Sequence, residues 1–326
     1  MRLKPARPHR HPHQLALAFA LACLAFPSCA PKAVDAPETK LVSGSRAELT
    51  LSDLALEPRA ADWLETRKAA GGALRVAMRE RADSYMPQAD GSVKGFDYEL
   101  VAELCRVTGL ELEVSVQRTI EAFFTRDGVM PPDLGRGGAH SYTPDLLETV
   151  DFYAGPFGIT AWREALADWV PLWPTRNVLA GRKGEEIGGV RDLDGKRFAV
   201  IQDSIQEKSL STLAEAEGIA LSFVYGDDEE SLFTLVESGG ADYALDASVV
   251  MAKSGQRHPA LTLSPFPEPV ITIGWAVKKD DAGLASLLAS FVRAAQENGL
   301  FAERWTATFL MDFGDYLDAV LATAGY

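Results

Sequence analysis

The sequence is short of cysteine and of long apolar runs, and each shortage excludes a class of protein. Of its 3 cysteines, Cys105 alone lies beyond the first 30 residues, so that part of the chain cannot form an internal disulfide. The longest apolar run, 15–26, is shorter than the about 20 residues that a membrane-spanning helix requires. We therefore expect neither a disulfide framework nor a membrane-spanning bundle, and we expect Cys105 to be a buried structural thiol.

Basic residues are also scarce relative to acidic ones. The chain has 32 Lys and Arg against 46 Asp and Glu, which gives a net charge of −14. The first 28 residues contain four basic residues and no acidic one, so without them the net charge is −18. A surface of this sign repels phosphate backbones, which argues against nucleic acid as a partner. Beyond this segment the histidines are His140 and His258, so we expect no metal site, and no motif indicates a cofactor.

The first 28 residues have the pattern of a secretory signal peptide. A basic start precedes the apolar run 15–26, and small residues follow it. The segment 26–29 is similar to the box that precedes the lipidated cysteine of bacterial lipoproteins. We therefore expect a location in the periplasm or cell envelope, with lipidation at Cys29 as the only contact with the membrane. Cleavage as an ordinary signal peptide is the alternative.

Beyond residue 56, the apolar pattern alternates between the periods of strands and helices. Strands are predicted at 74–78, 110–116, 197–201, 221–225 and 241–245, and helices at 60–68, 97–107, 204–217 and 229–237. Asp227 or Asp228 is expected to cap the last of these helices. Strands that alternate with helices at this spacing indicate an α/β fold built from two units with parallel strands.

The chain is predicted to pass between these two units twice. Residues 152–162 leave the first unit, and the apolar strand 271–278 follows the second. Two passages form a hinge, and the cleft between hinged lobes is a common ligand site. The predicted domains are a signal peptide at 1–28, a flexible tether at 29–56, lobe 1 at 57–160 and 271–326, and lobe 2 at 161–270.

Several short motifs carry a resemblance to a known family through their order and spacing. They are Leu74–Val76, Gly95–Leu100, Thr143–Pro144 and Val150–Phe152. With these motifs the chain resembles the family 3 extracellular solute-binding proteins. The resemblance implies the periplasmic binding protein type II fold, in which mixed sheets flanked by helices form two lobes joined by a two-crossing hinge. Within the family, the runs Ser84–Tyr85, Tyr98–Leu100 and Gly240–Tyr243 are most similar to the non-catalytic solute-binding domain of membrane-bound lytic murein transglycosylase F.

In the first lobe, the ligand site is expected where two loops border the cleft. Arg79 and Tyr85 flank the loop that follows the first strand. The resemblance implies that the loop 135–143 also holds ligand, through backbone and hydroxyl groups at His140, Ser141 and Tyr142. For each of these residues, packing within a surface loop or a lobe is the alternative.

In the second lobe, the strand 197–201 runs through Gln202, Asp203 and Ser204 into a helix. Backbone N–H groups at the start of a helix suit a carboxylate or another anion. Asp203 or Ser204 is also expected to cap this helix, and a charged cap at Asp203 would weaken anion binding.

Two positions depart from the pattern of the amino-acid receptors in this family. Those receptors hold the ligand's carboxylate with an arginine at the position of Leu146 and its ammonium with an aspartate at the position of Ala247. Here Asp246 comes one residue early, and a shift of one residue turns a strand side chain to the other face. We retain Asp246 as a candidate, but we expect a ligand other than a plain α-amino acid, such as a fragment derived from the cell wall.

The triplet Glu237–Gly239 is similar to the Glu-Ser pair that carries the catalytic acid of lytic transglycosylases. It is instead predicted to end the helix 229–237, because two glycines and a strand follow. Too few residues follow Trp305 for the helical catalytic domain of those enzymes. We therefore expect no enzymatic activity. The alternatives are a dehydratase-like enzyme on the same fold and a degenerate relative of a lytic transglycosylase.

The sequence thus predicts an exported solute-binding protein, a monomer that closes two lobes over a small-molecule ligand. We expect it to act as a transport receptor for an ABC permease or as a sensor for the cell-wall machinery. Trp162, Trp169 and Trp173 are predicted to pack near the hinge rather than to line a sugar-binding wall.

Overall fold

The computed structural model describes residues 48–118, 121–125, 145–185, 187–202, 204–248, 257–266 and 268–321. All of them belong to one unit of the chain, Thr39–Tyr326. Five predicted site residues lie outside the described ranges: Cys29, His140, Ser141, Tyr142 and Asp203. Among the helices in those ranges, none is long and apolar enough to cross a membrane.

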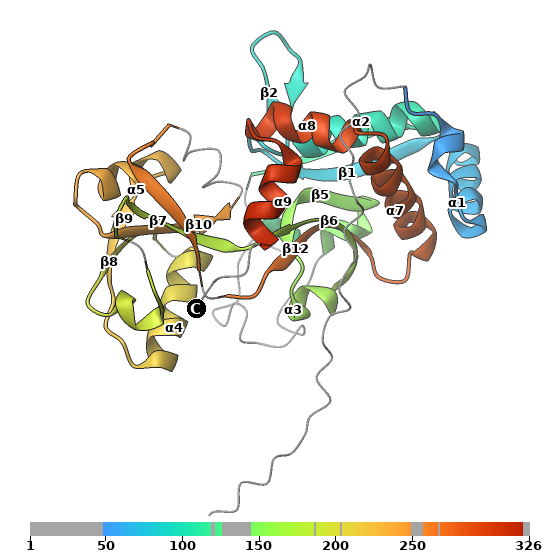
Figure 1. The fold of residues 1–326 in the computed structure, drawn as a ribbon. Coiled ribbons are helices and arrows are strands. Elements are labelled where there is room, and N and C mark those ends of the chain that lie inside the picture. The colour runs from blue at the N-terminus through green and yellow to red at the C-terminus, as the bar shows by residue number, and fades with distance from the viewer. Residues whose placement is uncertain are drawn as a thin grey trace, which may run out of the picture. The chain divides into compact units, whose positions relative to one another are not determined.

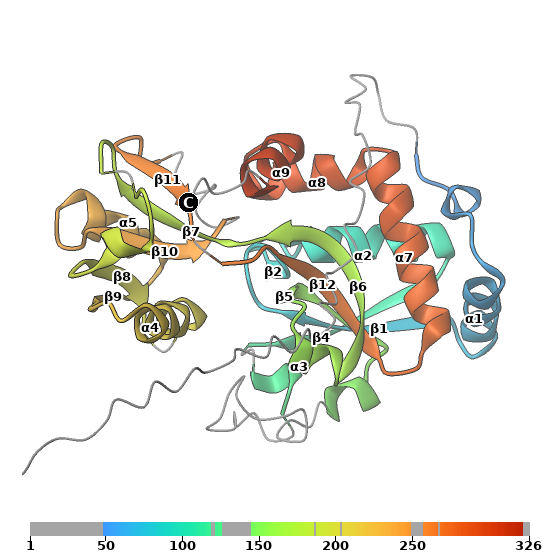
Figure 2. The same ribbon diagram turned by 60° about the horizontal axis from the view of Figure 1, so that its bottom comes forward.

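The first sheet has five strands in the order β4-β1-β5-β12-β6 (Figures 1 and 2). β1 pairs in parallel with both of its neighbours, whereas β12 is antiparallel to β5 and to β6. The predicted strand 271–278 is therefore part of the first sheet, although in the chain it comes after the strands of the second sheet. The bounds are Ala73–Arg79 for β1, Glu111–Gln117 for β4, Phe152–Gly158 for β5, Ala167–Thr175 for β6 and Ile271–Lys278 for β12.

Helices from both ends of the described chain pack around this sheet and form the first lobe with it (Figure 2). Their apolar faces meet in an aromatic core, where the ring of Phe96 lies 5.3 Å from Trp173 and 5.8 Å from Trp305. Trp173 is 2% exposed, so it packs in the core rather than lining a wall for a ligand. The short elements are η1 (Leu51–Leu54), β2 (Met86–Pro87), β3 (Val93–Lys94), η2 (Glu121–Phe123), η4 (Asp145–Glu148) and α3 (Ala161–Glu164). The helices are α1 (Pro58–Ala69), α2 (Phe96–Thr108), α7 (Ala282–Glu297), α8 (Leu300–Phe309) and α9 (Phe313–Leu321).

The second sheet has five strands in the order β11-β7-β10-β8-β9, and with its helices it forms the second lobe. β8 pairs in parallel with β9 and β10, while β7 is antiparallel to β10 and β11. The strands are β7 (Asn177–Arg182), β8 (Arg197–Ile201), β9 (Ser222–Gly226), β10 (Tyr243–Ala247) and β11 (Leu261–Pro265). The helices are η5 (Val190–Leu193), α4 (Ile205–Glu217) and α5 (Glu229–Glu237). Two sheets flanked by helices confirm the predicted α/β class.

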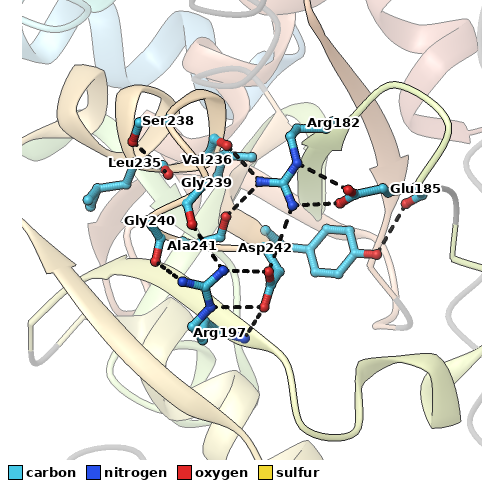
Figure 3. Close-up of polar contacts among 11 residues, drawn as sticks. Arg182, Glu185, Arg197, Leu235, Val236, Ser238, Gly239, Gly240, Ala241 and Asp242 are labelled. Atoms are coloured by element: carbon cyan, nitrogen blue, oxygen red, sulfur yellow. Dashed lines mark hydrogen bonds and ion pairs between the residues drawn. The ribbon is translucent and has the colours of Figure 1, made fainter.

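The end of α5 lies where the sequence predicts it, and two arginines bind carbonyl groups of its last turn and of the residues that follow (Figure 3). Gly239 has a left-handed φ of 75°, which terminates the helix at low steric cost. Arg182 donates to the carbonyl oxygens of Val236 (2.8 Å) and Ala241 (3.0 Å), and Arg197 to those of Gly240 (2.8 Å) and Gly239 (3.0 Å). The triplet Glu237–Gly239 is therefore a helix terminus within the second lobe.

Three predicted details of local structure are also seen. Ser204 caps α4 by accepting a hydrogen bond from the N–H of Glu207 at 3.2 Å. Asp228 caps α5 in the same way. Cys105 is a free, buried thiol, and burial raises its pKa to about 12.

Two boundaries differ from the prediction. The predicted tether includes residues 48–56, but Leu49 and Leu54 are 1% and 0% exposed and pack into the core of the first lobe. Hydrophobic burial outweighs the polar character of this segment. Strand β6 pairs with β12 in the first sheet, so the first passage to the second sheet occurs at Arg176 rather than near residue 161.

Candidate functional site

The loop after β1 presents a charged side chain towards the second lobe. The guanidinium of Arg81 is held by Asp83 through two hydrogen bonds of 2.8 Å and 3.0 Å. Its Nη2 atom lies 3.9 Å from a carboxylate oxygen of Glu229, the first residue of α5. Burial alone would lower the pKa of Arg81, but the charge of Asp83 and those of Glu229 and Asp246 raise it overall. Arg81 therefore remains a fixed positive charge between acids of both lobes.

This loop is anchored at the start of α2. The N–H of Phe96 donates to the carbonyl of Asp83 at 2.9 Å, and that of Tyr98 donates to Ser84 at 3.1 Å. Gly95 has a φ of 132°, and a Cβ atom there would lie 2.3 Å from the carbonyl oxygen of Ser84. The glycine of the family motif thus permits the close approach that positions Arg81.

Asp246 lies at the end of β10, close to the start of α4. Its Oδ1 atom is 3.3 Å from the side-chain amide nitrogen of Gln206. The pKa of Asp246 is raised to about 7, mainly by desolvation; the N–H of Ala247 and the charge of Arg81 oppose this rise, and the negative Glu229 adds to it. The one-residue shift therefore leaves this carboxylate within reach of the charge of Arg81 in the first lobe.

A buried acid, Asp97, lies next to the loop that carries Arg81. Asp97 is 1% exposed and accepts a hydrogen bond of 2.8 Å from the indole of Trp275 in β12. The pKa of Asp97 is raised to about 7, mainly by desolvation and in part by the nearby charge of Asp83, while the hydrogen bond from Trp275 opposes the rise. Near neutral pH the carboxyl group is therefore divided between its charged and neutral forms.

The polar groups continue from Asp246 towards the hinge. Gln206 also lies 3.4 Å from the side-chain oxygen of Asn177, the first residue of β7. Asn177 in turn donates to the carboxylate of Glu268 at 2.8 Å. Glu268 lies between β11 and β12, on the second passage, so this chain of side chains joins the two passages.

The predicted site residues fall into two groups. Asp246 and Ser204 lie at the end of β10 and at the start of α4, near Gln206. Arg79 ends β1 and is half-buried, and Tyr85 packs edge-on against Tyr98 with a centroid separation of 5.5 Å. Gln202 is exposed at the turn that follows β8. The structure thus brings together the β10 and α4 residues, whereas Tyr85 packs within the first lobe.

Sequence analysis missed Arg81, Gln206, Asn177 and Glu229 as individual residues. Arg81 lies within a loop that was predicted to border the site, and Gln206 lies two residues after the predicted cap Ser204. Those two positions were therefore within reach of sequence reasoning. Asn177 and Glu229 come near the site through the packing of the second lobe, which no local pattern reveals.

The position of the missing arginine is filled by an apolar cluster. Leu146 lies in η4 and packs against a cluster that contains Phe123, Phe124 and Phe157. The neighbouring Leu147 is 4% exposed and belongs to the same cluster. Leu146 is half-buried, and the guanidinium of Arg163 lies over the same Phe124 ring at 4.9 Å, so Leu146 adds an apolar contact and no charge at this position.

Within the part of the chain that the structure describes, no group of three or more His, Cys, Asp and Glu side chains is arranged to hold a metal ion.

Comparison with known proteins gives relatives by sequence. No protein-family model matches the chain. Membrane-bound lytic murein transglycosylase F of Photobacterium profundum is 27% identical over 241 residues, which are 71% of this chain and 43% of that protein. The protein of the same name from Desulfosudis oleivorans is 26% identical over 253 residues, 76% of this chain and 51% of its own length. The chain thus spans about half the length of the curated relatives that it matches.

Solved structures give relatives by fold. An ancestral cationic amino acid solute binding protein has a TM-score of 0.57 at 19% identity, over 76% of this chain and 99% of that one. An amino acid ABC transporter substrate-binding protein from Streptococcus pneumoniae, bound to L-arginine, has a TM-score of 0.53 at 21% identity, over 76% and 98%. An ancestral amino acid-binding protein described as a precursor of cyclohexadienyl dehydratase has a TM-score of 0.52 at 21% identity, over 76% and 99%. The predicted resemblance is confirmed: the chain has homologues named membrane-bound lytic murein transglycosylase F and the two-lobed fold of the family 3 amino-acid solute-binding proteins.

Proposed function

We propose that the chain is an extracytoplasmic solute-binding protein that closes its two lobes over a small ligand. The observation that carries this proposal is the meeting of charged groups from both lobes. Arg81 of the first lobe lies 3.9 Å from Glu229 of the second, and its charge acts on Asp246. Charged groups that converge from two hinged bodies suit a ligand held from both sides.

The proposed binding residues extend the set predicted from sequence. Arg81, Gln206 and Asp246 form its centre, because their side chains lie at the facing ends of β1, α4 and β10. Around them we place the predicted residues Arg79, Tyr85, His140, Ser141, Tyr142, Gln202, Asp203 and Ser204.

We further propose that the ligand is not a plain α-amino acid. Leu146 packs among aromatic rings where amino-acid receptors place an arginine, and Ala247 packs against the core of the first lobe. Both charged ends of the amino-acid clamp are thereby replaced by packing contacts. The name of the curated relatives supports a fragment derived from cell-wall murein as the ligand.

A binding role is favoured over catalysis by the environment of the Glu-Ser pair. The carboxylate of Glu237 lies 3.0 Å from Nδ1 of His258, whose ring stacks on Phe233 within the second lobe. Glu237 is thus an exposed residue at the end of α5, with a histidine of the segment before β11 as its neighbour. A dehydratase-like activity remains the second candidate, because Asp246 has a pKa of about 7, which suits a general acid or base.

Thermal-shift measurements with defined ligands test the binding proposal. We expect a purified disaccharide-tetrapeptide muropeptide to raise Tm, since any ligand of the native state does so, and L-arginine and L-glutamate to leave it unchanged. Asp246→Asn is expected to raise the apparent Kd for the muropeptide, obtained from the ligand dependence of Tm, at least about fivefold, because one charged contact is lost. Asp62→Asn changes a carboxylate of α1, far along the chain from these residues, and serves as the control.

Two outcomes would contradict the proposal. A strong shift with L-glutamate or L-arginine and none with the muropeptide would restore an ordinary amino-acid receptor. Sustained turnover of prephenate-like acids by the purified protein would make it an enzyme.

We propose a location in the periplasm or cell envelope, with a lipid anchor at Cys29. The partner would then be an ABC permease if the chain delivers its ligand for transport, or cell-wall machinery if it acts as a sensor. A likeness to a substrate-binding protein of an ABC transporter supports the first role, and the transglycosylase relatives support the second.

A further inference from the structure

The last helix of the described chain, α9, contacts both lobes where the chain passes between them. Tyr316 of α9 is 1% exposed. Its hydroxyl oxygen lies 2.9 Å from the carbonyl oxygen of Pro174 in β6 and 3.0 Å from the hydroxyl oxygen of Ser248. Pro174 belongs to the first lobe, whereas Ser248 follows directly on β10 of the second. One phenol group therefore connects an element of each lobe.

These contacts form a hydrogen-bonded chain with one direction. A carbonyl oxygen only accepts, so Tyr316 donates its single proton to Pro174. Ser248 must then donate to Tyr316, and Thr175 donates to Ser248 across 3.1 Å. Thr175 and Ser248 are 4% and 6% exposed, so water does not readily replace these partners.

Arg176 ties the same helix to the second passage. It lies on the first passage, is 8% exposed, and donates from Nη1 to the carbonyl oxygen of Val320 near the end of α9 at 3.4 Å. Its Nη2 lies 3.2 Å from the carbonyl oxygen of Phe266 and 3.3 Å from that of Glu268. A cation near the last carbonyls of a helix is electrostatically favoured. Arg176 thus joins both passages and α9.

We propose that α9 is a brace for the hinge, in which Tyr316 and Arg176 hold the two passages together and limit the motion of the lobes. Movement of one lobe against the other would strain the hydrogen bonds that Tyr316 makes to each. Asp246 lies two residues before Ser248 on the same strand. The brace would therefore also bias the ligand site, a consequence that rests on the proposed function.

Hydrogen exchange of the ligand-free, full chain tests the brace. The N–H of Ser248 donates to the carbonyl of Arg176 at 2.8 Å, and that of Phe266 donates to Asn177 at 3.1 Å, so both amides report on the first passage. In Tyr316→Phe the ring keeps its packing and loses the hydroxyl. We expect both amides to exchange about 2- to 10-fold faster, the range expected for one lost hydrogen bond.

Tyr243→Phe is the matched control. Tyr243 is 5% exposed and its hydroxyl donates to the carbonyl of Glu185 at 3.1 Å, so both groups lie in the second lobe. This variant is expected to leave exchange at Ser248 and Phe266 unchanged. Small-angle scattering is expected to show a larger radius of gyration for Tyr316→Phe and an unchanged one for Tyr243→Phe.

Ser248→Ala breaks the same chain of hydrogen bonds at its second-lobe member, and it should reproduce the faster exchange of the Phe266 amide. Equal exchange rates for Tyr316→Phe, Ser248→Ala and the control would overturn the brace. Because no ligand is present, failure of muropeptide binding would not affect this result. Faster exchange without any change in muropeptide affinity would support the role of α9 in restraining the hinge and would contradict its proposed effect on the ligand site.

Discussion

The first and second lobes share one strand order but support it with different side chains. Starting from the edge strand that is parallel to its neighbour, the order across the first sheet is β4-β1-β5-β12-β6, and that across the second is β9-β8-β10-β7-β11. In each sheet the first three strands are parallel, and each of the last two is antiparallel to its inner neighbour. The equivalent positions of the two lobes can therefore be compared directly.

Each lobe contains the same arginine–aspartate clasp at the start of its central strands. Asp151 accepts hydrogen bonds from the backbone N–H (2.8 Å) and the guanidinium (2.9 Å) of Arg75. Asp242 accepts the equivalent bonds from the backbone N–H (2.9 Å) and the guanidinium (2.8 Å) of Arg197. The clasp therefore joins β1 to β5 in one lobe and β8 to β10 in the other.

The two clasps differ in what surrounds them. The side chain of Asp151 is 5% exposed and also binds the guanidinium of Arg67. The side chain of Asp242 is 20% exposed and lies 3.8 Å from the guanidinium of Arg182, and its partner Arg197 also binds the carbonyl groups of Gly239 and Gly240 just after α5. In the first clasp, a buried carboxylate is thus bound by two arginines. In the second, the carboxylate is more exposed, and its arginine also binds carbonyl groups next to a helix end.

A second pair of equivalent residues follows the same contrast. Asp97 and Gln206 are each the second residue of the helix that follows the central strand. Asp97 is enclosed by the core and bound by Trp275, while Gln206 lies among Asn177 and Asp246 beside the hinge. At this pair of positions, the first lobe has a buried structural acid, whereas the second has a polar side chain near the hinge.

The largest expected effect is at the first clasp. Asp151→Asn leaves two guanidinium groups against a neutral amide in a buried setting, so we expect the free energy of unfolding to fall by about 3–4 kcal/mol. Urea denaturation at pH 7 measures this change. The exposed, paired Glu65 provides the control, and Glu65→Gln should cost less than about 1 kcal/mol. Equal effects of Asp151→Asn and Glu65→Gln would show that the first clasp is no stronger than an exposed ion pair.

The next effect is the pH dependence that Asp97 imposes on the first lobe. Its pKa is raised to about 7 in the folded state, against about 3.9 when unfolded, so the folded state binds the extra proton. The unfolding free energy therefore falls as the pH rises from about 4 to 7. Asp97→Asn keeps an acceptor for Trp275 and removes this titration.

Between pH 5 and pH 8, the gain in stability of Asp97→Asn over the native chain should grow by about 2–3 kcal/mol. Urea denaturation at the two pH values gives this difference. A constant gap between the two proteins would mean that Asp97 stays charged throughout the range. Asp97→Asn should leave the muropeptide affinity within about twofold of the native value, since the residue is structural.

Much of this comparison could be predicted from sequence, because it depends on local patterns. The central strands, their following helices and the caps at Ser204 and Asp228 follow from periodicity and capping chemistry. The family motif also contains Asp97 and Gly95. The equivalence of the lobes could not be predicted, since it lies in pairing between segments such as Arg75 with Asp151, far apart in the chain.

The site was predicted less completely than the fold for the same reason. The loop after β1 and the turn before α4 can be predicted because they follow strand ends, where ligands commonly bind in α/β proteins. The contact of Arg81 with Glu229 depends on how two separately folded sheets face each other. The predicted boundary of lobe 1 near residue 161 differs from the structure for the same reason. The sequence of β6 does not show that this strand pairs with β12 in the first sheet.

The smallest effect is expected at the second clasp. The hydrogen bond from Arg197 lowers the pKa of Asp242, so its contribution is present above the unfolded pKa of about 3.9 and lost as the pH falls through the folded value. Asp242→Asn should therefore cost about 1–2 kcal/mol at pH 7 and much less near pH 2. Urea denaturation at both pH values, with exchange followed in β8 and β10, measures the loss. A cost at pH 7 as large as that of Asp151→Asn would show that the second lobe depends on its clasp as heavily as the first, and the contrast between the two clasps would fail.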